Sequence, residues 1–120
     1  MLPNAPTPSG DDLRCYVIIN TNILTPIQVG VQAAHALAEL VHKKPMREST
    51  DKWVTKDKTL IFLSATENDR DTIMVAMNRL GKTYASFREP DIGDVWTATA
   101  FEPIPSDLGR ALFGRLSLAK

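Results

Sequence analysis

A segment of small and aliphatic residues near the N-terminus places the strongest constraint on how this chain folds. Its polar side chains recur at intervals of four, three, four and three: Gln28, Gln32, His35, Glu39 and His42. This spacing places them all on one stripe of an α-helix. Thr25, Pro26 and Gln28 have the pattern of an N-cap, a first-turn proline and a capping-box glutamine, and Pro45 closes the segment. We therefore expect a helix from about 26 to 43, buried on most sides, with one file of hydrogen-bonding groups.

Patterns further along the chain indicate alternating strands and helices. Apolar or alternating runs predict strands at residues 13–20, 59–64, 83–88 and 95–101. A capping signature at Thr66–Asp69 and a terminal Gly81 bound a second helix. The inner face of that helix is expected to carry Ile73, Met77 and Leu80. A last helix is expected over 107–116, with Ser106 as its cap.

The order of these elements, β-α-β-α-β-β-α, predicts an α/β fold. We expect a single-domain three-layer sandwich in which a four-stranded mixed sheet has helices on both faces. A length of 120 residues and an apolar content of 43% suffice for one such core. The first strand is apolar at almost every position, which is typical of a central strand covered on both sides.

Residues 1–12 are expected to form a flexible, proline-rich lead, followed by the domain at 13–120. The lead has neither the basic flank nor the apolar centre of a secretory signal, and no apolar run approaches the ~20 residues of a membrane helix. The lone Cys15 fits a reducing compartment and a packing role. We therefore expect a cytoplasmic protein that does not bind membranes.

Charge is balanced overall, with 14 basic and 14 acidic side chains, but it is unevenly placed. A basic excess lies between residues 42 and 58, and comprises Lys43, Lys44, Arg47, Lys52, Lys56 and Lys58. The stretch from Pro45 to Asp57 has no sustained period and is expected to be a long loop. It is either a solvated loop or a rim that binds phosphate.

Three motifs stand out: Gln28-Val-Gly-Val-Gln-Ala-Ala-His-Ala36, Phe87-Arg-Glu-Pro-Asp-Ile-Gly93 and Trp96-Thr-Ala-Thr-Ala100. Over about residues 13 to 118 they resemble the type 2 peptidyl-tRNA hydrolase family, particularly its bacterial and phage-like branch. The resemblance implies a four-stranded mixed sheet flanked by helices, and hydrolysis of the ester between a peptide and the 3′ ribose of tRNA. It also implies a homodimer, in which Trp53 or Trp96 could anchor the interface. No cofactor is expected.

The helix motif of the family has a lysine, a glutamine four residues on and a histidine three further. Gln32 and His35 match the last two, and Gln28 stands at the lysine position. An uncharged amide binds phosphate or an oxyanion less well than a fixed cation. Gln28 is either a substrate-binding residue or only the third residue of a capping box.

The acidic residue that the family carries after its third strand has two candidates here, because Glu89-Pro90-Asp91 replaces the usual Asp-Ala-Gly. Thr97 aligns with a threonine of the last strand. The resemblance thus implies a catalytic set of His35, Gln32, Thr97 and either Glu89 or Asp91, with His35 moving the proton between water and the ribose oxygen. The alternative for His35 is a purely structural role, as a half-buried histidine whose ring nitrogens are hydrogen-bonded within the fold.

The positions expected to contact substrate phosphates are Gln28, Lys43, Lys44 and Arg88. No metal site is expected, because His35, Glu39 and His42 lack the spacing of the zinc helix motif. The competing hypothesis is that the same fold binds or cleaves a smaller nucleotide-like ligand, such as a signalling nucleotide in a phage or defence setting. The glutamine at position 28 favours this alternative.

Overall fold

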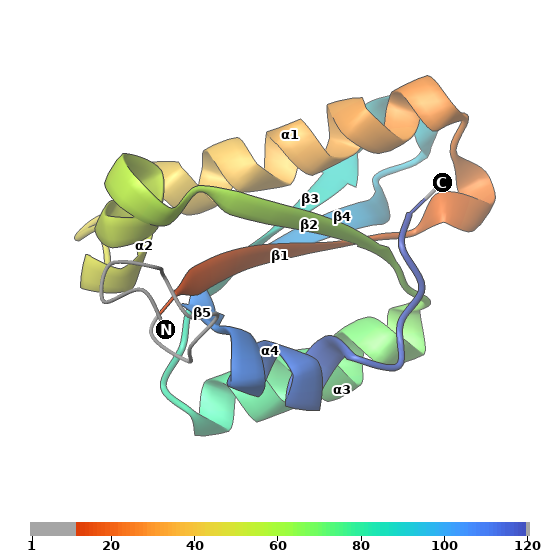
Figure 1. Cartoon of the computed structure of the whole chain (residues 1–120). Coiled ribbons are helices and arrows are strands. Elements are labelled where there is room, and N and C mark those ends of the chain that lie inside the picture. Colours follow the sequence, from red (N-terminus) through yellow and green to blue (C-terminus); the bar gives the residue numbers. More distant parts are fainter. Residues whose placement is uncertain (1–11, 120) are drawn as a thin grey trace.

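A mixed β-sheet forms the middle layer of the computed structural model, which describes residues 12–119 (Figure 1). Its main strands are β1 (Leu13–Ile19), β2 (Thr59–Ser64), β3 (Tyr84–Glu89) and β4 (Val95–Phe101). They lie in the order β2-β1-β4-β3, with β1 parallel to β2 and the other pairs antiparallel. A two-residue strand that the sequence did not indicate, β5 (Ile104–Pro105), pairs with the start of β1.

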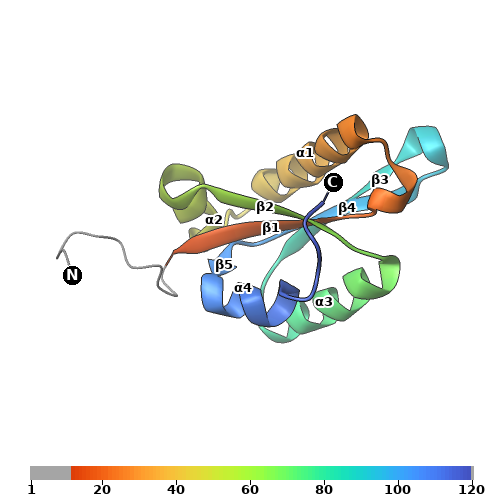
Figure 2. The same ribbon diagram turned by 45° about the vertical axis from the view of Figure 1, so that its right-hand side comes forward.

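Helices cover both faces of this sheet, as Figures 1 and 2 show. On one side lie α1 (Pro26–His42) and α2 (Glu48–Lys52), and on the other lie α3 (Glu67–Arg79) and α4 (Ser106–Phe113). Short 3-10 turns, η1 (Thr21–Ile23) and η3 (Pro90–Ile92), precede α1 and follow β3. The predicted α/β sandwich is confirmed. Of the expected lead at 1–12, only Asp12 lies within the described residues.

The two faces of β1 supply both halves of the core. Cys15, Val17 and Ile19 point into the cluster under α1, whereas Tyr16 and Ile18 point into the cluster with α3 and α4. All five side chains are at most 5% exposed. Successive side chains of a strand point to opposite faces, so an unbroken apolar run is what a strand covered on both sides requires.

The segment expected to be a loop is mostly helical. It contains α2 and then a π-helical turn, η2 (Trp53–Asp57). Trp53 is buried, and its indole nitrogen donates to the carbonyl oxygen of Thr59 at 2.7 Å. Hydrogen bonds from Lys52 and from the backbone of Leu13 hold the pKa of Asp57 below its usual range. Burial of one tryptophan therefore orders a polar stretch whose own sequence has no helical period.

Three finer expectations were wrong. α1 packs against the sheet on one side only, and Ile27 and Val31 on its outer side are 81% and 47% exposed. Leu80 does not belong to the inner face of α3, because α3 ends at Arg79 and Leu80 is 48% exposed. Ser106 is the first residue of α4 and not its cap, and α4 ends at Phe113.

Within residues 12–119, none of the helices has the length and apolarity needed to cross a bilayer.

Close packing of α4 on the sheet depends on Gly109. A methyl group added there would collide with the ring and hydroxyl of Tyr16, whereas a methyl group at Gly30, on the exposed side of α1, would meet nothing within 4 Å. We expect Gly109→Ala to lower the free energy of unfolding by about 1–3 kcal/mol through overpacking. Gly30→Ala should raise it by about 0.5–1 kcal/mol, because alanine is the better helix former. Urea unfolding of both variants measures this, and equal effects at the two sites would contradict the packing.

Candidate functional site

An extra residue in β4 shapes the face of the sheet beneath α1. Phe87 of β3 pairs with Ala98, but the next residue, Arg88, pairs with Trp96, so Thr97 has no partner of its own across β3. Such a bulge interrupts the alternation of side chains along a strand. Ala98 belongs to the cluster under α1 and Trp96 to the cluster on the opposite face. The side chain of Thr97 lies on the α1 side, where it meets Gln32.

A chain of hydrogen bonds joins Thr97, Gln32 and Glu89, from β4, α1 and β3. The Thr97 hydroxyl donates to Oε1 of Gln32 at 2.6 Å, and Nε2 of Gln32 donates to Oε1 of Glu89 at 2.9 Å. An ionised carboxylate can only accept, so Glu89 takes the NH₂ end of the amide and leaves its carbonyl oxygen for Thr97. Thr97 is 0% exposed and Gln32 is 3% exposed, while Glu89 is half-buried. The chain thus runs from the core to a carboxylate at the surface.

His35 lies one helical turn beyond Gln32 on the same side of α1. Its ring stacks on Phe87, with 4.4 Å between ring centroids and an angle of 8° between planes. Phe87 and Glu89 are two residues apart in β3 and so point to the same face, about 7 Å apart along the strand. His35 is exposed, and no side chain among residues 12–119 bonds to its ring nitrogens. An imidazole open to water and a hydrogen-bonded carboxylate therefore lie at neighbouring positions.

Phe87 is the residue of this site that we did not assign from the sequence. It was part of a recognised motif, but an aromatic residue in a strand is usually a core residue. Only the placement of α1 over β3 shows that the ring supports His35. The i,i+4 spacing of His35 and Glu39 offers a further contact, but no bond between their side chains forms in the described structure.

Asp91 and Arg88 do not contribute side-chain contacts to this cluster. Asp91 is exposed in η3, and of the two candidate carboxylates only Glu89 contacts Gln32. Arg88 pairs with Trp96 on the face of the sheet opposite to α1, and its guanidinium donates to the carbonyl oxygen of Asp94 at 3.3 Å. Alternation along β3 therefore separates Arg88 from Glu89.

Gln28 forms the capping box that its position predicted. Its side-chain oxygen accepts from the backbone of Thr25 at 2.8 Å, and the Thr25 hydroxyl accepts from the backbone of Gln28 at 3.3 Å. The residue at the lysine position of the family motif thus holds the start of α1. Its amide oxygen is already engaged.

Lys43 and Lys44 follow the far end of α1. Ten residues separate Gln32 from His42, which is roughly 15 Å along a helix axis. The two lysines line a separate cavity of about 610 Å³. They are therefore not part of the Thr97–Gln32–Glu89 cluster.

Three other side chains that could have had a functional role, Cys15, Trp53 and Trp96, are buried in the core. Burial raises the pKa of the Cys15 thiol to about 12, which keeps it protonated and unreactive near neutral pH. Trp53 and Trp96 are 7% and 1% exposed, so neither is available to stack on a base or to anchor a dimer. Within the described part of the chain, no three His, Cys, Asp or Glu side chains are grouped closely enough to hold a metal ion.

No protein-family model matches the sequence, and no curated protein matches it either.

The hydrogen bond between Thr97 and Gln32 should couple the two residues energetically. Thr97→Val leaves the buried Oε1 of Gln32 without a donor, which should lower the free energy of unfolding by about 1–3 kcal/mol. In a Gln32→Leu background the same change should cost much less, because no polar atom remains to be satisfied. Urea unfolding of the two single variants and the double variant gives the coupling free energy. Additive effects would show that the bond contributes nothing.

Proposed function

We propose that this protein is an esterase that cleaves the bond between a peptide and the 3′ ribose of tRNA. The observation that supports this is the hydrogen-bonded chain Thr97–Gln32–Glu89, with His35 stacked beside it on Phe87. The residues come from the three motifs that resemble type 2 peptidyl-tRNA hydrolases. An exposed imidazole next to an oriented carboxylate is a suitable arrangement for activating water.

In the proposed reaction, Glu89 orients the water that attacks the ester carbonyl. Gln32 occupies Oε1 of Glu89, which leaves Oε2 to accept a hydrogen bond from the water. His35 takes the proton from the water as the new C–O bond forms, and returns it to the 3′ oxygen of the ribose as the ester bond breaks. The products are a peptide with a free carboxyl group and a tRNA with a free 3′ hydroxyl. Hydrolysis of this kind needs no cofactor.

Thr97 acts through Gln32. The hydroxyl of Thr97 holds the carbonyl end of the amide whose NH₂ end bonds to Glu89, and Phe87 fixes the plane of His35. Both supporting residues are parts of strands, and a site on rigid elements holds its geometry better than one on loops.

His42, the second histidine of α1, provides a matched control for the role proposed for His35. We expect His35→Ala to lower the rate of peptidyl-tRNA hydrolysis by about 10²–10⁴. His42→Ala removes an exposed imidazole from the same helix, beyond the cluster, and should leave the rate unchanged. Single-turnover hydrolysis with both variants measures this, and a melting curve checks that each is folded. Full activity in a folded His35→Ala protein would refute the assignment.

A smaller nucleotide-like substrate is the second candidate, and the capping box favours it. The Thr97–Gln32–Glu89–His35 cluster contains no lysine or arginine, and Gln28 is already bonded to Thr25. Phosphates of a long polyanion would therefore meet little positive charge at this end of α1. A panel of peptidyl-tRNA, aminoacyl esters and cyclic or linear nucleotides distinguishes the two candidates.

The variant Gln28→Lys also tests whether the substrate is tRNA or a smaller ligand. The change removes the side-chain half of the capping box and should lower the free energy of unfolding by up to about 1 kcal/mol. If tRNA is the substrate, the added cation should also strengthen binding and steepen its dependence on salt. Thermal melting and peptidyl-tRNA binding at two salt concentrations separate these effects. Unchanged binding in the variant would favour the smaller ligand.

A further inference from the structure

A groove lined by cations lies between the end of α1 and the turn that precedes β3. It consists of two adjoining cavities, of about 610 and 380 Å³, which share Lys43, Arg47 and Thr83. The smaller one is also lined by Lys82 and Tyr84. Neither cavity has a carboxylate in its lining. The groove is a different site from the cluster around Gln32, which lies further back along α1.

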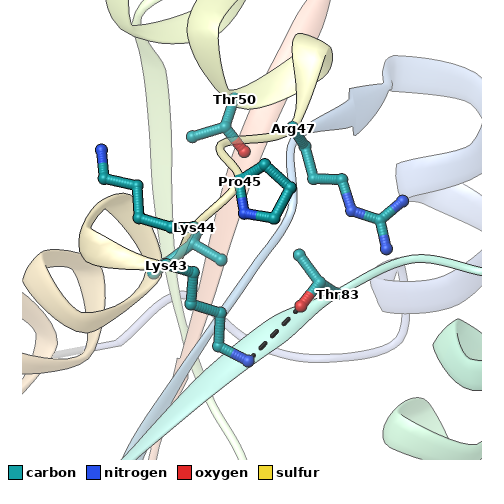
Figure 3. Close-up of a pocket in the computed structure, with 7 residues that line it drawn as sticks. Lys43, Lys44, Pro45, Arg47, Thr50 and Thr83 are labelled. Atoms are coloured by element: carbon teal, nitrogen blue, oxygen red, sulfur yellow. Dashed lines mark hydrogen bonds between the residues drawn. The ribbon is translucent and has the colours of Figure 1, made fainter.

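Figure 3 shows side chains that line the larger cavity, with Lys43 and Arg47 near Thr83. Lys43 and Arg47 extend on either side of Thr83, while the side chain of Lys44 runs in another direction. The ammonium of Lys43 donates to the Thr83 hydroxyl at 3.4 Å. That partner is uncharged, so the positive charge of Lys43 is not neutralised. Lys43 and Arg47 are both exposed and accessible to a ligand.

One buried carboxylate lies behind these cations. Glu102 is 4% exposed, and its oxygens accept from the Ser49 hydroxyl at 2.6 Å and the Thr83 backbone at 2.9 Å. Its oxygens lie 4.0 Å from Nε of Arg47 and 3.7 Å from Nζ of Lys82. Charge-assisted hydrogen bonds are shorter, at about 2.7–2.9 Å. Glu102 therefore attracts Arg47 and Lys82 without forming a direct hydrogen bond to either, and the N–H groups of both side chains remain available to a ligand.

The balance of charge around the groove favours an anion. Lys43, Arg47 and Lys82 line the groove, and of these Arg47 and Lys82 lie near the carboxylate of Glu102, which leaves a positive excess. The acidic side chains of α2, Glu48 and Asp51, line another cavity, which Arg47, Lys82 and Glu102 also border. Guanidinium and ammonium groups beside a hydroxyl match the charge and the acceptors of a phosphate group.

We propose that this groove binds a phosphate group of a nucleotide or of an RNA chain. The cations and the Thr83 hydroxyl hold the phosphate oxygens, and the neighbouring hollow offers the ring of Tyr84 and the amide of Asn78 to the rest of the ligand. No part of this inference depends on hydrolysis at His35. Binding of these phosphate groups at the groove would support this site whether or not the protein hydrolyses peptidyl-tRNA, and the two proposals are therefore separately testable.

The experiment is a binding titration followed by NMR, with inorganic phosphate, adenosine monophosphate and a short single-stranded RNA as probes. We expect the backbone signals of Lys43, Arg47 and Thr83 to shift. Lys43→Gln and Arg47→Gln should each weaken the binding of the tightest probe about tenfold or more. Lys56→Gln removes an exposed lysine that borders neither cavity, and should change the affinity less than twofold.

The probes separate the two sources of phosphate. Salt-dependent binding of RNA alone assigns the groove to a phosphodiester chain, whereas binding of the mononucleotide or of free phosphate assigns it to a small ligand. Lys43→Gln removes none of the hydrogen bonds or ion pairs of Glu102, so it remains informative if Arg47→Gln loosens the fold. The inference is overturned if no probe binds, if the shifts fall on residues outside the groove, or if Lys56→Gln weakens binding as much as Lys43→Gln.

Discussion

The hydrogen bond between Thr97 and Gln32 determines what the α1 face of the sheet can do. Without the extra residue in β4, alternation would place Thr97 and Ala98 on opposite faces, and Gln32 would be buried with no donor for its carbonyl oxygen. The bulge satisfies that atom, and the amide then presents its NH₂ group to Glu89. A local irregularity in one strand thus orients three side chains from three different elements. The carboxylate at the surface is held by a group that is itself fixed in the core.

Glu102 has a comparable role at the other end of α1. It is a buried carboxylate bonded to α2 through Ser49 and to the start of β3 through the backbone of Thr83. A buried charge is tolerated only when it is hydrogen-bonded or paired, and here both conditions hold. The same residue that ties these segments together also draws two cations to the rim of the groove. Structure and surface charge are therefore linked through one side chain.

The sequence predicted the elements whose patterns are local. β2 and β4 have the bounds that their composition indicated, and the capping boxes at Thr25 and Thr66 begin α1 and α3. What could not be predicted depends on partners far away in the chain. The five-residue helix α2 has no period of its own, and the burial of Trp53 and the bond from Ser49 to Glu102 position it. The exposed side of α1 was missed because apolar composition alone does not show how many neighbours a helix has.

The candidate site divides in the same way. Gln32, His35 and Thr97 were expected because the short motifs that contain them resemble those of a known family, and each motif is local in the sequence. The choice of Glu89 over Asp91 follows from the register of β3 against β4, which no single motif records.

The central place of β1 in the sheet also constrains the order in which the chain can fold during synthesis. β1 pairs with β2, but also with β4 and β5, which lie at residues 95–105. Its second edge therefore stays unpaired until residues 95–105 have left the ribosome, and contacts of such long range slow folding.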